Sequence, residues 1–125
     1  MKEIRFRAFV KNLKRMVPVE MIDFTFQTVV VDLTDGNGDV SEYGFDEIEL
    51  IQFTGLKDKN GKEIYEGDIC LDSKGALMVV VYENGCFYLE YQRTDIGMGY
   101  LFREIPFIRV IGNFLEHPEL LTATK

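Results

Sequence analysis

Hydrophobic and polar residues alternate along much of the chain with the two-residue period of β-strands. In the segment Lys2–Phe9, Ile4, Phe6 and Ala8 fall on one face and the residues between them fall on the other. This pattern predicts a half-buried strand, because successive side chains of a strand point to opposite sides of its sheet. A second strand is predicted at Met16–Met21. The N-terminal region is therefore expected to form a β-hairpin.

Further strands are predicted where β-branched and aromatic residues gather between turn-forming residues. They span Phe24–Leu33, Glu47–Phe53, Ile69–Leu71, Leu77–Tyr82, Cys86–Tyr91 and Phe107–Asn113. Leu77–Tyr82 is almost continuously apolar, which predicts that both of its faces are covered. Phe45–Leu50 also fits a short helical turn. Because Pro18 has no N–H to donate, its strand is expected to lie at a sheet edge or to bend there.

Turns are concentrated in the central segment Thr54–Cys70. There Thr54-Gly55-Leu56 is expected to leave a strand, and Asp58–Gly61 and Glu66-Gly67-Asp68 are expected to form tight turns. The residues expected to fix these turns are Gly55, Asn60, Gly61, Tyr65, Gly67 and Asp68. Outside this segment we expect turns at Asp35–Asp39 and Asn84–Gly85, a glycine-rich loop at Asp95–Gly99, and one helical turn at His117–Leu121.

Short antiparallel strands in this succession predict a mostly β protein. We expect a small SH3-like β-barrel core over residues ~54–114, because consecutive hairpins build small barrels. An N-terminal hairpin and a variable insert would occupy residues ~1–53, and a short C-terminal helical turn residues ~115–125. The sequence contains no internal repeat, low-complexity tract or linker. A single domain over residues 1–125 is therefore expected.

Length and composition agree with an intracellular globular protein. The chain has 125 residues, of which 46% are hydrophobic, enough to bury a core without disulfides or a metal. Its cysteines, Cys70 and Cys86, lack the spacing of a metal or redox motif. Charged residues interrupt the start where a signal peptide would be apolar, and no apolar run approaches the ~20 residues of a membrane helix. We expect a cytoplasmic protein.

The formal charge of −7 is unevenly distributed. Residues 1–16 hold six basic residues and one acidic residue, whereas the whole chain holds 14 and 21. The basic residues that could bind a partner are Arg5, Arg7, Lys11, Lys14 and Arg15. The more common explanation is a strand whose charges prevent aggregation. The alternative is a docking surface for an acidic partner, including a second copy of the chain.

Three segments occur in the same order as in a known family. They are KEIRFRAFVKNLKRMV (residues 2–17), QFTGLKDKNGKEIYEGDIC (residues 52–70) and IRVIGNFLEHPELL (residues 108–121). The chain thus resembles the YopX family of phage and prophage proteins, and the central segment is the most specific of the three. Phe9 stands where relatives usually have an aromatic residue such as Trp, and Cys70 where they usually have Val. The resemblance implies an SH3-like barrel core and a phage or prophage source, but no activity, cofactor or catalytic residue.

One acidic loop partly matches a calcium site. Asp35, Asn37, Asp39 and Asp46 fall at positions one, three, five and twelve of a calcium-type loop. However, Val40 replaces the glycine at position six, and Asp replaces the usual Glu at position twelve. A hairpin loop whose Asp and Asn side chains bond their own backbone is the favoured interpretation.

Other candidate chemistry is weak. The carboxylates of Glu63, Glu66 and Asp68 lie close in the sequence, and paired carboxylates can act in acid–base catalysis when they are buried. Nearby lysines instead indicate an exposed turn in which Asp68 bonds backbone amides. Neither cysteine lies near His117 in the sequence, so a Cys–His enzyme is not expected. Two further segments carry no recognisable chemistry: Asp58–Gly61 lacks the spacing of a phosphate-binding loop, and Gly97-Met98-Gly99 is expected to be a flexible connection.

Aromatic residues leave nucleic-acid binding open. Phe87, Tyr88 and Tyr91 could stack bases, although Glu83 and Glu90 lie among them and a core role is favoured. The leading hypothesis is a non-enzymatic phage or prophage accessory protein that acts through protein–protein contacts, with a homo-oligomer as one form. The alternative is a nucleic-acid-associated module that uses the basic N-terminal hairpin.

Overall fold

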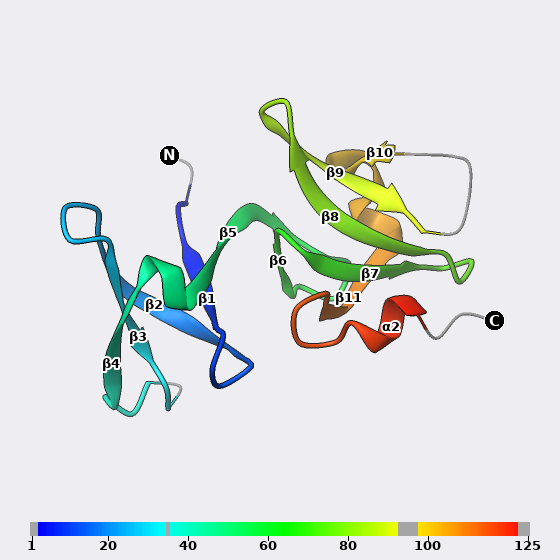
Figure 1. The fold of residues 1–125 in the computed structure, drawn as a ribbon. Helices are drawn as coiled ribbons and strands as arrows, with labels where there is room; N and C mark the ends of the chain where they lie inside the picture. The colour runs from blue at the N-terminus through cyan, green and yellow to red at the C-terminus, as the bar shows by residue number, and fades with distance from the viewer. Residues whose placement is uncertain (1–2, 35, 93–97, 123–125) are drawn as a thin grey trace. The chain divides into compact units, whose positions relative to one another are not determined.

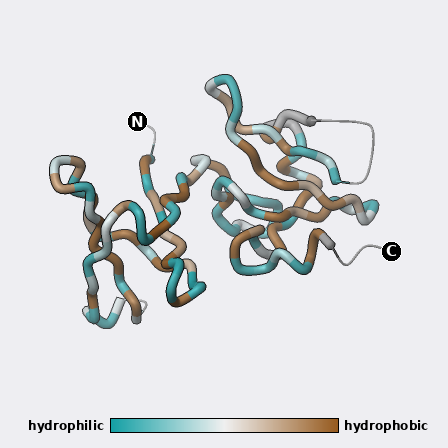
Figure 2. Tube along the Cα trace, viewed as in Figure 1, coloured by the Kyte–Doolittle hydropathy of each residue, from teal (hydrophilic) through white to brown (hydrophobic). Residues whose placement is uncertain are grey.

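The computed structural model describes residues 3–34, 36–92 and 98–122, and it divides into two compact units. The first unit spans Glu3–Gln52 and the second begins at Phe53. Strand β5 (Ile48–Lys57) passes from one unit into the next, so each unit uses one half of this strand. Figure 2 shows hydrophobic residues along the strands and hydrophilic residues at many of the turns.

The first unit is an antiparallel sheet with the order β4-β3-β2-β1-β5 (Figure 1). Its strands are β1 (Phe6–Val10), β2 (Arg15–Asp23), β3 (Thr28–Asp32), β4 (Val40–Gly44) and the first half of β5, with a 3-10 helix (Phe45–Glu47) before β5. Alternate residues of neighbouring strands bury one face: Ala8, Val10, Val17, Val29, Val31 and Ile48. The predicted N-terminal hairpin and the short helical turn near Phe45 are confirmed.

The first unit differs from the prediction at one strand start and at one additional strand. Residues Phe24–Gln27 form a turn instead of starting a strand, because Asp23 Oδ1 accepts the backbone N–H groups of Thr25 and Phe26 at 2.9 and 3.0 Å. Strand β4 was not predicted. Pro18 lies where β2 changes partners: residues up to Pro18 pair with β1, and residues from Val19 pair with β3, with a bulge between Val19 and Met21. The bulge agrees with the predicted bend, whereas the predicted edge position is not observed, since β2 lies inside the sheet. A proline is tolerated at such an irregularity.

The second unit contains a sheet with the order β10-β9-β8-β7-β11 and a hairpin of β5 with β6. Its strands are β6 (Glu63–Tyr65), β7 (Asp68–Asp72), β8 (Leu77–Glu83), β9 (Cys86–Tyr91), β10 (Met98–Tyr100) and β11 (Ile108–Asn113). Two four-residue helices, α1 (Leu101–Glu104) and α2 (Glu119–Thr122), and a 3-10 helix (Ile105–Phe107) complete it. Its core consists of Ile64, Cys70, Met78, Val80, Leu89, Leu101 and Ile108.

The mostly β class is confirmed, but the expected small SH3-like barrel is not. The strand pairings of the described residues form open antiparallel sheets. Thr54-Gly55-Leu56 stays within β5, because Thr54 Oγ1 donates to Ile64 O of β6 at 2.7 Å and holds the strand in the hairpin. Met98 and Gly99 belong to β10, whereas Gly97 and most of the expected loop Asp95–Gly99 lie outside the described residues.

The remaining turns of the second unit agree with the sequence. Asn84 and Gly85 have φ values of 52° and 82°, the left-handed pair that closes a two-residue hairpin between β8 and β9. The predicted helical turn at the C-terminal end corresponds to α2. No helix among the described residues is long and apolar enough to cross a membrane.

Candidate functional site

The acidic residues of the central segment hold backbone. Asp68 is 1% exposed, and its Oδ2 accepts the N–H of Tyr65 at 2.8 Å, as the sequence suggested. Asp58 is 6% exposed and accepts three N–H groups: those of Asn60 at 2.8 Å, Lys62 at 2.9 Å and Val110 at 2.8 Å. The bond to Val110 joins residues 52 positions apart. Asp58 therefore fixes both its own turn and the position of β11.

Burial and hydrogen bonding act on Asp58 in opposite directions. Desolvation by itself raises the pKa of its carboxyl, but the hydrogen bonds from Val110, Lys62 and Asn60 and the charge of Lys62 outweigh it. The net result is a pKa below the ordinary value of 3.8, so the carboxylate stays charged at neutral pH. Sequence reasoning treated Asp58 as one residue of a polar turn and missed this role.

The glycines and Tyr65 of the central segment were also expected to fix its turns. Gly55, Gly61 and Gly67 have φ values of 88°, 85° and 84°, which favour glycine. Only Gly67 is also crowded, because a Cβ there would lie 2.8 Å from a ring carbon of Phe114. Tyr65 packs its ring 5.3 Å from that of Phe53, and its hydroxyl donates to Glu63 Oε1 at 3.3 Å. The contacts of Tyr65 with Phe53 and Glu63 support the hairpin of β5 and β6, and the close approach of Gly67 and Phe114 joins the next turn to the segment after β11.

The two thiols differ in burial. Cys70 is fully buried, and burial, followed by the charges of Asp68 and Asp58, raises its pKa to about 12. Such a thiol does not form a thiolate at neutral pH. Cys86 is exposed at the end of the β8–β9 turn. The single histidine is committed elsewhere, since His117 Nδ1 accepts the N–H of Asn113 at 3.1 Å.

The calcium-like spacing does not produce a wrapped loop. Asp46 follows strand β4, whereas Asn37 and Asp39 precede it, so they lie at opposite ends of that strand. Asp35 lies outside the described residues. The carboxylate that organises this turn is Asp32, which accepts the N–H of Thr34 at 2.9 Å. Among residues 3–34, 36–92 and 98–122, no three His, Cys, Asp or Glu side chains are grouped so as to hold a metal ion.

The structure separates the basic residues of the N-terminal hairpin into two groups. Arg5 forms an ion pair with Glu3 at 2.8 Å, and Arg7 lies half-buried on β1 between Pro18 and Ile51. Lys11, Lys14 and Arg15 are exposed at the β1–β2 turn, about 20 Å from Arg5 along the strand. Lys11 Nζ donates to Asp46 O at 3.2 Å, and Arg15 Nη2 donates to Leu33 O at 3.0 Å. The turn thus carries three exposed basic residues, of which Lys11 and Arg15 bond backbone carbonyls of their own chain.

Two of the aromatic residues considered for base stacking pack against the core. Phe87 and Tyr91 contact the buried cluster of the second unit, and the ring of Phe87 also lies 4.9 Å from that of Tyr82. Tyr88 is half-buried opposite Val81. The favoured core role is therefore confirmed for Phe87 and Tyr91.

Comparison with known proteins adds a family to this geometry. The family model described as YopX protein matches residues 5–122. The chain belongs to the YopX family. Among solved structures, it is similar to the crystal structure of protein EF1440 from Enterococcus faecalis, with 26% identity and a TM-score of 0.69. That similarity covers 97% of this chain and 99% of the other. No curated protein matches the chain.

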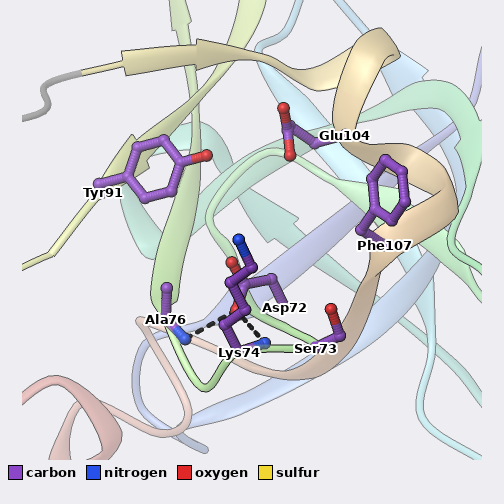
Figure 3. A pocket seen from close by; sticks show the side chains of 7 residues that line it. All are labelled: Asp72, Ser73, Lys74, Ala76, Tyr91, Glu104 and Phe107. Atoms are coloured by element: carbon purple, nitrogen blue, oxygen red, sulfur yellow. Dashed lines mark hydrogen bonds between the residues drawn. The ribbon is translucent and has the colours of Figure 1, made fainter.

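A cavity of about 540 Å³ opens in the second unit of this YopX chain. Its lining consists of Asp72, Ser73, Lys74, Ala76, Tyr91, Glu104 and Phe107 (Figure 3). Tyr91 and Glu104 face each other across it, and burial, followed by the charges of Glu104 and Asp72, raises the pKa of the phenol. Asp72 Oδ1 is occupied by the N–H groups of Lys74 and Ala76, each at 2.8 Å. A neutral phenol and a carboxylate can hydrogen-bond a small polar molecule, and the volume suits one.

Proposed function

We propose that this YopX-family chain is a non-enzymatic accessory protein of phage or prophage origin that acts in the host cytoplasm by binding other proteins. One observation carries the proposal: the β2–β3 turn presents two phenylalanine side chains to solvent. Phe24 is 72% exposed and Phe26 is 77% exposed. Burying a phenylalanine stabilises a complex by about 1.5–3 kcal/mol, so two on one turn form an effective anchor.

The contacts around this turn favour a preformed binding element. Asp23 Oδ1 accepts two backbone N–H groups within it, Phe45 N donates to Gln27 O at 2.9 Å, and the ring of Phe24 lies 6.1 Å from that of Phe45, edge to face. These bonds fix the backbone before a partner arrives, which lowers the entropic cost of binding. The engagement of Asp58, Asp68 and His117 with backbone groups also supports a role without acid–base chemistry.

Affinity capture from phage-infected cells tests this proposal. The tagged wild type and the variant Phe24→Ser/Phe26→Ser are used as parallel baits, and the proteins that co-purify are identified. We expect at least one phage or host protein to be retained by the wild type and lost by the variant. A variant with Thr25→Ser, in the same turn, is the matched control and should retain the partner. Identical protein sets from the wild type and the phenylalanine variant contradict the proposal.

A second candidate function is nucleic-acid association, favoured by the grouping of Lys11, Lys14 and Arg15 on one exposed turn. Such binding depends on phosphate contacts and weakens steeply as salt is added. The net charge of −7 opposes it. Filter binding of DNA and RNA at low salt distinguishes the two candidates: retention that is lost in Lys11→Gln/Lys14→Gln/Arg15→Gln supports association, and no retention by the wild type contradicts it.

A further inference from the structure

A groove of about 380 Å³ lies on the second unit, on the side of strands β8 and β9 where the segment after β11 packs. Its lining residues are Glu66, Gly67, Val79, Val80, Val81, Tyr82, Glu83, Glu90, Gln92, Phe114 and Leu121. Most of this lining is apolar. Tyr82 and Phe114 are 49% and 43% exposed, so two aromatic side chains remain open to a partner.

The wall formed by Phe114 is fixed. Phe114 N donates to Gly67 O at 3.0 Å, and Gly67 N donates to Val80 O at 2.8 Å, which ties the wall to strand β8. Its ring also lies so close to Gly67 that a Cβ at that position would approach it to 2.8 Å. The groove is therefore a preformed feature, because its shape depends on backbone contacts.

Carboxylates surround this apolar floor. Glu66, Glu83 and Glu90 line the groove, and none of the described lining residues is basic. None of the three forms an ion pair within the described part of the chain. Burial raises the pKa of Glu66, as expected for a carboxylate that has no cation beside it. An occupant with an apolar centre and a cationic periphery would satisfy both parts of the groove.

The β1–β2 turn of the same chain has those properties. Leu13 is 41% exposed at its tip, and Lys11, Lys14 and Arg15 surround it in sequence. Lys14 has a φ of 53°, and Leu13 N and Lys14 N both donate to Val10 O, at 3.2 and 2.8 Å. The turn is a short, fixed projection with one leucine and three cations. Its apolar tip and its basic residues complement the apolar floor and the carboxylates of the groove.

We propose that the groove binds the β1–β2 turn of a second copy of this chain, with Leu13 against Val79 and Phe114 and the cations beside the three glutamates. This inference rests on the proposed function, since it names a second copy as one protein partner. The contact joins two different surfaces. In a pair of copies, one therefore keeps an unused groove and the other an unused turn. Further copies can bind at these free surfaces, so association continues into a ring or a chain.

Complementary variants test the contact. The turn variant Leu13→Ser/Lys14→Asn keeps the hydrogen bonds of Lys11 and Arg15, and asparagine accepts a positive φ. The groove variant Glu83→Gln/Glu90→Gln changes two exposed side chains, and Phe114→Ser serves as a second groove variant. Circular dichroism and urea unfolding establish that each variant is folded. Sedimentation velocity then measures mass against protein concentration at low and high salt.

We expect the wild type to self-associate. Each variant alone should associate at least about tenfold more weakly than the wild type, or remain monomeric. Added salt should weaken association of the wild type. An equal mixture of the turn variant and a groove variant should form a 1:1 dimer and nothing larger, because only one matching pair of surfaces remains. A wild type that is monomeric at every concentration overturns the inference, as does a mixture that remains monomeric or a folded variant that associates like the wild type. The proposed function is tested separately through Phe24 and Phe26, so a monomeric wild type leaves that test intact.

Discussion

Two turns of the second unit have the same local structure and different roles. The turns 58–62 and 72–76 both have the sequence Asp-x-x-Gly-x. In each, the aspartate Oδ1 accepts the N–H groups two and four residues ahead, and the glycine has a φ of 85° or 88°. The aspartate N–H also donates to the carbonyl four residues ahead, at 2.8 Å from Asp58 and 3.0 Å from Asp72. Five residues thus specify the same turn twice.

The difference lies in the second carboxylate oxygen. Asp58 Oδ2 accepts the N–H of Val110, and Lys59 N donates to Ile108 O at 3.2 Å, so the first turn is bonded to β11. Asp72 is half-buried and lines the cavity of Figure 3, and among the described residues its Oδ1 accepts only the local backbone N–H groups of Lys74 and Ala76. A local motif therefore forms the turn in both places, and only its neighbours decide whether the carboxylate also stabilises the tertiary fold.

Removing the two carboxylates should separate these roles. Asp58→Ala leaves the N–H of Val110 and two turn N–H groups without their acceptor, and we expect it to lower the free energy of unfolding by about 3 kcal/mol. Asp72→Ala removes local turn bonds only, and we expect a loss of about 1 kcal/mol. Urea unfolding measures both. Equal losses would show that the bond to Val110 contributes nothing to stability.

The thiol of Cys70 reports where the structure opens. Cys70 is fully buried and pairs with Val110 across β7 and β11. In Asp58→Ala we expect its alkylation under native conditions to be about a hundredfold faster than in the wild type, because labelling follows the opening free energy. Asp72→Ala should change the rate much less. Exposed Cys86 is the internal control and should react at the same rate in every variant.

The pH dependence of stability should report the charge of the Asp58 carboxylate. The pKa of Asp58 is lower in the folded chain than its ordinary value of 3.8. Its contribution to stability is therefore complete above that value and is lost as the pH falls through the folded pKa. Asp58→Asn cannot be protonated, so its unfolding free energy should fall less than that of the wild type between pH 5 and pH 2. Parallel acid titrations followed by circular dichroism provide the measurement, and superimposable slopes would contradict the assignment.

Substitution of the glycine in each turn should lower stability by the same small amount. This comparison is the control for the local structure of the two turns. Gly61 and Gly75 have nearly equal φ values, and an added Cβ would meet no atom within 4 Å at either position. Alanine at each site should therefore cost about 1 kcal/mol from backbone strain alone. Urea unfolding of Gly61→Ala and Gly75→Ala tests this. If the two variants differ in unfolding free energy by much more than about 1 kcal/mol, the turns differ in local structure as well as in their long-range bonds.

Predictions from the sequence succeeded where one short segment determines its own geometry. Asn84-Gly85 closes a hairpin, and Asp68 holds a backbone amide of its turn. They failed where pairing with distant segments decided the outcome. The edge position predicted for Pro18 failed because β2 pairs on both sides, although its bulge agrees with the predicted bend, and Thr54 remains in β5 because its hydroxyl bonds β6. No pattern in residues 40–44 distinguished β4 from a loop.

The sequence by itself determined the family, the mostly β class and the turns, because these depend on the order of residues and on local backbone preferences. It also showed that cations gather near the N-terminal hairpin. Only the tertiary structure decided which of two equivalent aspartates bonds β11, which thiol is buried, and that Leu13 projects among cations while a groove on the second unit is surrounded by carboxylates. Those properties depend on contacts between residues far apart in the chain, and a local pattern does not specify such contacts.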